Sequence, residues 1–217
     1  MRQDAARSLA ALPRTATVAI TTLTLLAWLV AEVTASASGA ALALGFIPAR
    51  FSGAAVPWAA VPAWLTPLSA TVVHSGLIHL GFNMLMLVWC GAAVERILGW
   101  PSLLILYLAG AYAAAAAQWA TDPMGVVPMV GASGAISAVI GAYSLSFGRP
   151  RQVTGSARLN RWINALWLMA AWVLLQMMMG WLAGGQGYLL ATPAHIGGFA
   201  AGLLLQRPLL LWRYRGA

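Results

Sequence analysis

Residues 74–83 read HSGLIHLGFN, and they place two histidines and an asparagine at the start of a long apolar stretch. His79 and Asn83 are four positions apart, so they share one face of a helix. His74 comes five positions before His79, about 140° away around that helix, and we expect it to face a different environment. Because polar groups are costly inside a bilayer, they mark functional sites there by default. The stretch therefore predicts a membrane helix that carries a site.

The composition around this stretch is that of a membrane protein. Of the 217 residues, 61% are hydrophobic and 7% are charged, and the mean hydropathy is +0.81. No hydrophilic block is long enough for a separate soluble domain. We expect one membrane domain over residues 15–212, between a short basic segment at 1–14 and a short basic tail at 213–217. The net charge of +8 is explained better by membrane topology than by nucleic-acid binding.

Six apolar stretches are long enough to cross the membrane, which takes roughly 20 residues for a helix. They are about Thr15–Val33, Val72–Leu98, Ser102–Ala120, Val130–Phe147, Trp162–Trp181 and Pro193–Trp212. The connector at about 34–71 is rich in Ala and Pro, and its Trp58 and Trp64 favour a loop lying at the membrane interface. The sequence thus predicts an all-α polytopic bundle of six transmembrane helices.

The twelve basic residues, all arginines, predict the orientation of this bundle. With both termini cytoplasmic, every arginine except Arg50 lies on or near the cytoplasmic side, as the positive-inside rule requires. The basic start and the Ala-Ser-Ala triplet at 35–37 also suggest a cleaved signal peptide. The apolar run is long for that role, however, and Glu32 interrupts its end, which favours a retained first helix.

Three of the predicted helices begin with polar chemistry. The second carries His79 and Asn83, the fourth opens with GASGA around Ser133, and the sixth opens with AHIGGFAAG at His195. All three helices run from outside to inside, so these side chains should lie at a similar depth below the outer surface. A serine, a histidine and further hydrogen-bond donors at one level indicate a nucleophile, a base and an oxyanion site.

Small residues would let the candidate nucleophile and base meet. Gly131 and Gly134 flank Ser133, and Gly198 and Gly202 form a GxxxG face after the histidine, so the fourth and sixth helices can approach closely. The four acidic residues of the chain are Asp4, Glu32, Glu95 and Asp122. None has an evident claim to orient the histidine, so we predict a Ser–His dyad without a carboxylate.

Each signal also has a structural interpretation. A serine between small residues is an ordinary packing motif of membrane helices, and His79 with Asn83 could simply bridge helices by buried hydrogen bonds. No set of carboxylates accompanies the histidines, so a metal site is not expected, although a lone histidine inside a membrane could also bind a cofactor. The single cysteine, Cys90, allows no intrachain disulfide and is expected to be a packed thiol. The joint occurrence of the signals favours catalysis.

These motifs, in this order, resemble the rhomboid family of intramembrane serine proteases. The resemblance runs from about residue 64 to 205, through WLTPLSATVVHSGLIHLGFNML, VERILG, GASGAISAVIGAY and AHIGGFAAG. It implies Ser133 as nucleophile, His195 as base, His79 and Asn83 as oxyanion donors, and a supporting polar role for His74. It also implies substrates that are transmembrane segments of membrane proteins, cut near their outer ends after lateral entry near helices two and five. No cofactor is implied. The compact length favours a bacterial cytoplasmic (inner) membrane.

Two positions depart from the family pattern. Family members often carry a Trp-Arg pair in the first loop, but Leu65 follows Trp64 here. Many have an aromatic residue four positions after the serine, stacked on the histidine; here that position is Ser137, so something else must hold the imidazole. An inactive rhomboid-like protein that binds transmembrane clients is the main alternative, but both dyad residues are present. A small transporter should show internal repeats or broken helices around a midplane site, and the sequence shows no repeat.

Overall fold

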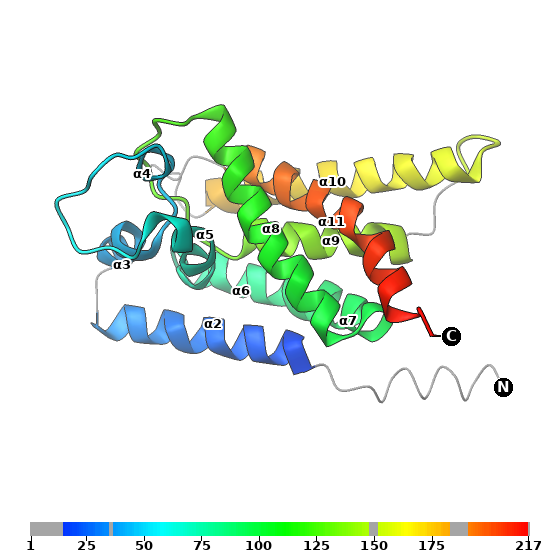
Figure 1. Cartoon of the computed structure of the whole chain (residues 1–217), viewed down its shortest axis with the longest axis horizontal. Helices are drawn as coiled ribbons and strands as arrows, with labels where there is room; N and C mark the ends of the chain where they lie inside the picture. Colours follow the sequence, from blue (N-terminus) through cyan, green and yellow to red (C-terminus); the bar gives the residue numbers. More distant parts are fainter. Residues whose placement is uncertain (1–14, 35–36, 148–151, 183–190, 217) are drawn as a thin grey trace.

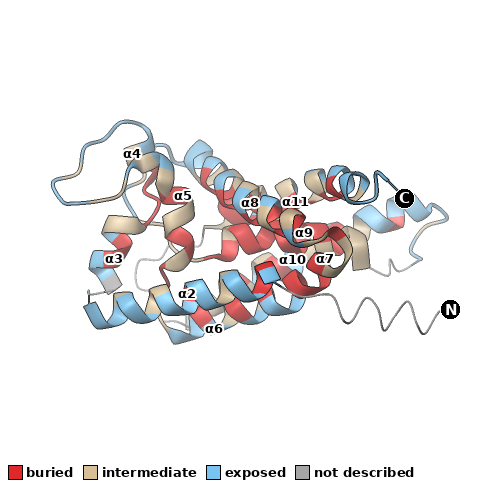
Figure 2. Ribbon diagram, turned by 60° about the horizontal axis from the view of Figure 1, so that its bottom comes forward, coloured by how far each residue is buried: buried red, intermediate tan, exposed pale blue. Residues whose placement is uncertain are grey.

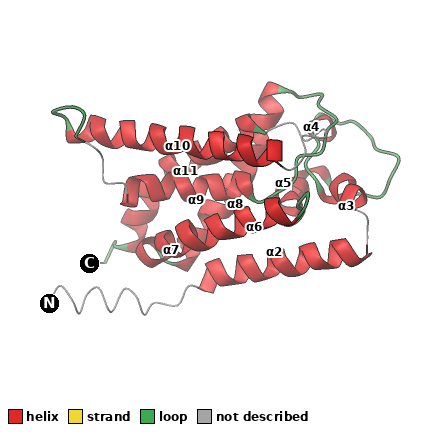
Figure 3. Cartoon of the chain, turned by 180° about the vertical axis from the view of Figure 1, so that it is seen from behind, coloured by secondary structure: helices red, strands yellow, loops and turns green. Residues whose placement is uncertain are grey.

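The structure is a computed structural model that describes residues 15–34, 37–147, 152–182 and 191–216. Throughout this part of the chain the secondary structure is helical and no β-strand occurs (Figure 3). The all-α prediction is therefore confirmed for the described residues. The basic segment 1–14, the arginines at 149 and 151, and the glycine-rich loop near 184–187 lie outside them.

The body of the described chain consists of long helices that match the predicted apolar stretches. They are α2 (Thr15–Thr34), α6 (Leu77–Met86) continued by the π-helical turn η3 (Leu87–Gly91) and α7 (Ala92–Leu98), α8 (Trp100–Thr121), α9 (Ser133–Phe147), α10 (Ala157–Leu182) and α11 (Thr192–Arg213). Among the described residues, α2, the α6–α7 unit, α8 and α10 are long and apolar enough to cross a membrane. The apolar α9 has 15 residues, and α11 has 22 but carries several polar side chains.

The connector after α2, predicted as an interfacial loop, is folded into short helices. It contains α3 (Ala37–Leu44), α4 (Pro48–Phe51), the 3-10 helix η1 (Ala63–Leu65), α5 (Thr66–Ser69) and the 3-10 helix η2 (Ala70–Val72). Prolines in the first turns of α4 and α5 suit helix starts, because they lack an N–H that would go unpaired there. Phe46 is fully buried and exchanges two backbone hydrogen bonds with Met129, at 3.0 and 2.8 Å. The connector is thereby fastened to the segment that leads into α9, while Trp58 and Trp64 stay exposed.

Helix α9 is the centre of the bundle, and most of its side chains are buried (Figure 2). The α6–α7 unit, α8, α10 and α11 all pack against it. An apolar helix that is covered on every side belongs in a core. Glycines make the approach of α11 possible: a methyl group at Gly198 would collide with the Gly134 carbonyl oxygen, and one at Gly202 with that of Ala138. Small residues thus bring the α9 and α11 backbones into direct contact.

Helix α2 lies at the edge of the bundle (Figure 1), and Glu95 of α7 holds its start by hydrogen bonds. The buried Glu95 carboxylate accepts the backbone N–H groups of Ala16 and Thr17, each at 2.9 Å, and the Thr17 hydroxyl at 2.6 Å. A negative charge at a helix N-terminus satisfies N–H groups that have no partner inside the helix and complements the helix dipole. The carboxylate therefore docks the first long helix onto the second.

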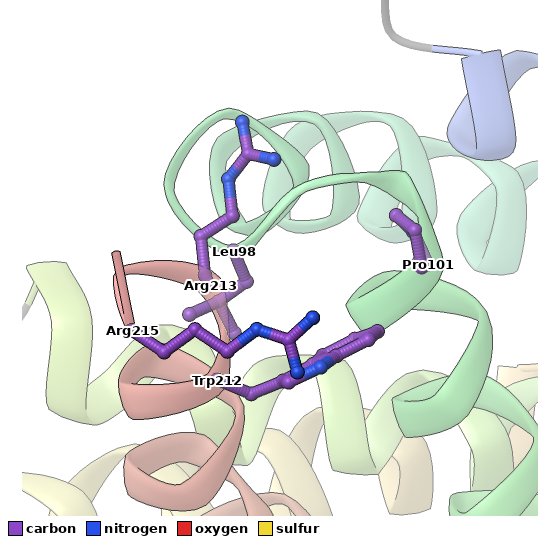
Figure 4. A pocket seen from close by; sticks show the side chains of 5 residues that line it. All are labelled: Leu98, Pro101, Trp212, Arg213 and Arg215. Carbon is purple, nitrogen blue, oxygen red and sulfur yellow. The ribbon is translucent and has the colours of Figure 1, made fainter. Parts of the chain in front are cut away.

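The far ends of α7 and α11 meet at the α7–α8 turn. Gly99, with φ +82°, makes this turn, and the Tyr214 hydroxyl donates to the Ile97 carbonyl at 3.1 Å. Trp212, Arg213 and Arg215 line a cavity of about 220 Å³ there, together with two apolar residues of the turn (Figure 4). Gln206 Nε2 also donates to Ser146 Oγ at 3.1 Å near the end of α9. The α6–α7 unit, α9 and α11 therefore run in the same direction.

Candidate active site

Ser133 and His195 meet where α9 and α11 begin. Ser133 is the first residue of α9, and His195 lies in the first turn of α11, after a proline that starts the helix. Their side chains are 62 positions apart in sequence, yet His195 Nε2 lies 2.9 Å from Ser133 Oγ. Only 7% of Ser133 and 5% of His195 is exposed. A neutral imidazole whose Nε2 accepts a serine hydroxyl is placed to remove its proton when the oxygen attacks a carbonyl.

The other ring nitrogen of His195 has no hydrogen-bond partner in the described part of the chain. In the catalytic triads of other serine hydrolases a carboxylate occupies that position and fixes the tautomer and the ring orientation. The single hydrogen bond to Ser133 does not by itself fix the rotation of the imidazole ring about that bond. Its orientation here must come from the side chains that pack against it.

An indole from α10 supplies one such contact. The Trp172 ring meets His195 edge-on, with ring centroids 6.3 Å apart and an interplanar angle of 76°. Trp172 is buried, and its Nε1–H donates to Ser137 Oγ at 2.8 Å. Sequence reasoning left open what would hold the imidazole and did not single out Trp172, since α10 carries other tryptophans at positions that look equally suitable.

His79 lies against the turn that leads into α9. A Cβ at Gly131, whose φ is +109°, would stand 2.6 Å from His79 Cε1 and 2.7 Å from Nε2. On the other side of the ring, Nδ1 accepts the Ser75 N–H at 3.5 Å and lies 3.0 Å from Ser75 Oγ. A neutral ring that accepts at Nδ1 carries its proton on Nε2, so His79 presents a donor toward the start of α9. Sequence reasoning missed Ser75.

Asn83 is fully buried one turn after His79. Its Nδ2 donates to the His79 carbonyl at 2.9 Å, and its Oδ1 has no partner in the described structure. The two residues share a helix face as their spacing requires. No described hydrogen bond joins Asn83 to Ser133 or His195. In this conformation its amide stabilises α6, and one of its two N–H groups remains for another acceptor.

His74 lies elsewhere than the helical spacing suggests, and the expectation that it faces a different environment from His79 is wrong. The α6 helix begins only at Leu77, after Gly76 with φ +145°, so His74 precedes the helix. The two imidazoles meet edge to face with centroids 5.0 Å apart, and His74 Nε2 accepts the Ala132 N–H at 3.4 Å. Burial, and then the nearby His79, lower the pKa of His74 to about 3. His74 therefore stays neutral and keeps this acceptor.

The space beside the serine is small. Ser133 and Gly134 line a cavity of about 10 Å³ together with residues of α5, α8 and the start of α11. Such a volume holds about one water molecule, so a peptide segment could enter only if neighbouring elements move. In the described residues no group of three His, Cys, Asp or Glu side chains could hold a metal ion.

Comparisons with known proteins agree with the motifs. Residues 61–212 match the Rhomboid domain. The chain is 40% identical to "Rhomboid protease GluP" of Bacillus subtilis (strain 168) over 79 residues, which are 36% of this chain and 15% of that protein. It is 26% identical over 142 residues to "Rhomboid-type serine protease 2" of Emericella nidulans, covering 65% of this chain and 26% of that protein.

A plant relative extends the match. "RHOMBOID-like protein 5" of Arabidopsis thaliana is 28% identical over 144 residues, which are 66% of this chain and 43% of the relative. The chain spans less than half of the length of each of these three relatives. The domain match nevertheless covers most of the chain, including the second to the last of the long helices. The resemblance drawn from the motifs is confirmed, and the chain belongs to the rhomboid family.

Proposed function

We propose that this protein is an intramembrane serine endopeptidase in which Ser133 is the nucleophile and His195 is the base. The observation that carries the proposal is the 2.9 Å contact between His195 Nε2 and Ser133 Oγ in a buried site. Membership of the rhomboid family supports it, as do the names of two relatives, a rhomboid protease and a rhomboid-type serine protease.

The reaction proceeds in two steps. Ser133 Oγ attacks the carbonyl carbon of the scissile bond while His195 Nε2 takes the hydroxyl proton, and the imidazolium then protonates the leaving amine. This gives an acyl-enzyme and a new amino terminus. Water then attacks the ester carbonyl and gives its proton to His195. The C–O bond to Ser133 breaks, and the proton returns to Oγ, which restores both side chains.

Negative charge that develops on the carbonyl oxygen needs hydrogen-bond donors. The Ser133 backbone N–H lies in the first turn of α9, where N–H groups have no partner inside the helix. The His79 Nε2–H faces the same turn across Gly131. Asn83 joins these donors when one of its amide N–H groups turns toward the oxygen. His74 supports them by holding the Ala132 N–H.

The membrane arrangement completes the proposal. The six long helical segments span the membrane, with the segment 1–14 and the tail 213–217 on the cytoplasmic side of a bacterial inner membrane. The dyad then lies near the outer face, where water can reach it. Substrates are transmembrane segments of membrane proteins that enter laterally beside α6 and α10 and are cut near their outer ends. The reaction requires no cofactor.

Purified wild type, Ser133→Ala and His195→Ala in liposomes test the proposal. Each is incubated with a tagged single-span substrate that carries small residues at its outer end, and the fragments are identified by mass spectrometry. Ser144→Ala is the matched control, because Ser144 is a buried serine of the same helix that donates only to the carbonyl of Gly141. We expect cleavage by wild type and the control, and none by the two dyad variants.

Labelling with a fluorophosphonate separates two kinds of failure. A wild type that is labelled at Ser133 without cleaving is an active enzyme given the wrong substrate. A folded wild type that neither cleaves nor becomes labelled would refute the protease assignment and favour a protein that binds transmembrane clients. Cleavage that persists in folded Ser133→Ala would show that another residue is the nucleophile.

A further inference from the structure

His195 has one hydrogen bond, to Ser133, and its Nδ1 has no partner in the described structure. One bond at Nε2 leaves rotation of the ring about that bond undetermined. General-base catalysis, however, needs Nε2 aligned with the serine oxygen within a few tenths of an ångström. The neighbours that restrict this rotation thus belong to the machinery of the site.

We infer that Trp172 is the positioning residue for His195 and that Ser137 sets the orientation of Trp172; the inference rests on the proposed function. The edge-on contact between the two rings, at 6.3 Å and 76°, is the geometry that aromatic rings favour. Trp172 is 3% exposed and comes from α10, outside the helices that carry the dyad. Trp172 thus supplies the aromatic contact to His195 that Ser137, at the usual aromatic position of α9, cannot make.

A short hydrogen-bond chain fixes the indole relative to the nucleophile. The Trp172 Nε1–H donates to Ser137 Oγ at 2.8 Å, and the Ser137 hydroxyl donates to the Ser133 carbonyl at 2.6 Å. Ser137 is fully buried, and its oxygen both accepts and donates, so its hydroxyl has one direction. The orientation of the Trp172 ring is therefore set, through Ser137, by the backbone of Ser133, the residue from which His195 takes a proton.

The indole also has a stacking partner. The ring of Phe82, from α6, stacks on Trp172 with centroids 5.7 Å apart and planes 20° from parallel. Helix α10 is otherwise mostly exposed, and Trp172 is its only fully or nearly buried aromatic side chain in the described range. The alignment of His195 consequently depends on α10 being seated against α6 and α9. A displacement of α10 would release the base.

The three histidines of the chain permit a test that needs no catalysis. In protein labelled with ¹⁵N-histidine, His195→Ala identifies the ring signals of His195. We expect Trp172→Leu, Trp172→Phe and Ser137→Ala each to shift those signals while the His74 signals stay in place, which also reports that the fold is retained. Trp167→Leu, on an exposed side chain of the same helix, and Ser144→Ala are the controls and should move none of them.

The rate of fluorophosphonate labelling at Ser133 gives the functional readout. Trp172→Phe keeps a ring but removes the indole N–H, and Ser137→Ala removes its acceptor. Each should slow labelling by roughly two- to tenfold, the effect of losing one hydrogen bond. The double variant should be no slower than the slower single variant, because both changes break the same bond.

The outcomes are distinct. His195 signals that stay in place in Trp172→Phe and Ser137→Ala overturn the inference, as do losses in labelling rate that multiply in the double variant. If folded wild type neither cleaves nor becomes labelled while the His195 signals still move in the variants, the proposed protease is refuted and the positioning role stands. Shifts confined to His195 together with non-multiplying losses in rate support both.

Discussion

The ring of His79 fills the space where a side chain at Gly131 would lie. A Cβ there would stand 2.6 Å from Cε1 and 2.7 Å from Nε2 of the imidazole, and the glycine φ of +109° is one that other residues rarely adopt. Two independent constraints therefore require glycine at this position. Together they place a ring N–H against the turn from which Ser133 starts α9, so the local backbone and the candidate oxyanion donor depend on each other.

Gly131→Ala should reduce the rate of Ser133 labelling about ten- to a hundredfold, because the methyl group displaces a proposed oxyanion donor. Backbone strain should also lower stability by about 1–2 kcal/mol. Gly81→Ala is the matched control: Gly81 is helical and exposed, with nothing within 4 Å of its would-be Cβ. Alanine there should be neutral or stabilise α6 by up to about 1 kcal/mol. Equal labelling of the two variants would contradict the role given to His79.

Glu95 should contribute more to stability than any other described acidic residue. Glu95→Ala leaves the N–H groups of Ala16 and Thr17 unpaired inside the protein, at a cost of about 2–4 kcal/mol. Glu95→Gln, which keeps one acceptor oxygen, should cost less. Glu32 is exposed near the end of α2, so Glu32→Gln should change little. The midpoints of thermal unfolding in detergent measure the relative stabilities of these three variants. An unchanged midpoint for Glu95→Ala would show that α2 does not need this cap.

Acid should destabilise the protein partly through His74. Its pKa is about 3 in the folded chain and 6.5 in the unfolded one, so between these values the unfolded chain binds a proton that the folded chain does not. Stability therefore falls as the pH decreases from about 6.5 toward 3. His74→Gln retains an acceptor for the Ala132 N–H but does not titrate. The midpoint of thermal unfolding should depend less steeply on pH between 7 and 4 in the variant; parallel curves would refute this contribution.

The sequence predicted those features that depend on local periodicity. Long apolar stretches located the helices, and the four-residue spacing put His79 and Asn83 on one face. Glycines beside Ser133 and after His195 indicated that two helices could touch. The position of His74 was mispredicted because Gly76 interrupts the helix on which the spacing argument relied.

Contacts between segments that are distant in the sequence could not be predicted from such local patterns. Nothing in the sequence of α10 distinguishes Trp172, whose ring meets His195, from the exposed Trp167. The short helices of the connector are similarly fixed by tertiary contacts, such as the pairing of Phe46 with Met129. These features follow from how the helices pack, which single-residue patterns do not encode.

Asn83→Ala distinguishes a catalytic role of Asn83 from a structural one, because the two roles affect kcat and stability differently. Its Nδ2 holds the His79 carbonyl, so Asn83→Ala should lower stability by about 1 kcal/mol through that bond. If its second N–H also serves the oxyanion, kcat should fall about a hundred- to a thousandfold with little change in KM, because the interaction forms only in the transition state.

A stability loss of the same size without that fall in kcat would restrict Asn83 to its structural bond. Ser146→Ala is a suitable comparison, because its hydroxyl also donates within its own helix, to the Ala142 carbonyl at 3.0 Å, and accepts from Gln206 Nε2, but lies near the far end of α9. It should reproduce the modest loss of stability and leave kcat unchanged. A common fall in kcat for both variants would instead indicate that any weakening of the bundle slows the reaction, and the oxyanion role would then have no support from kinetics.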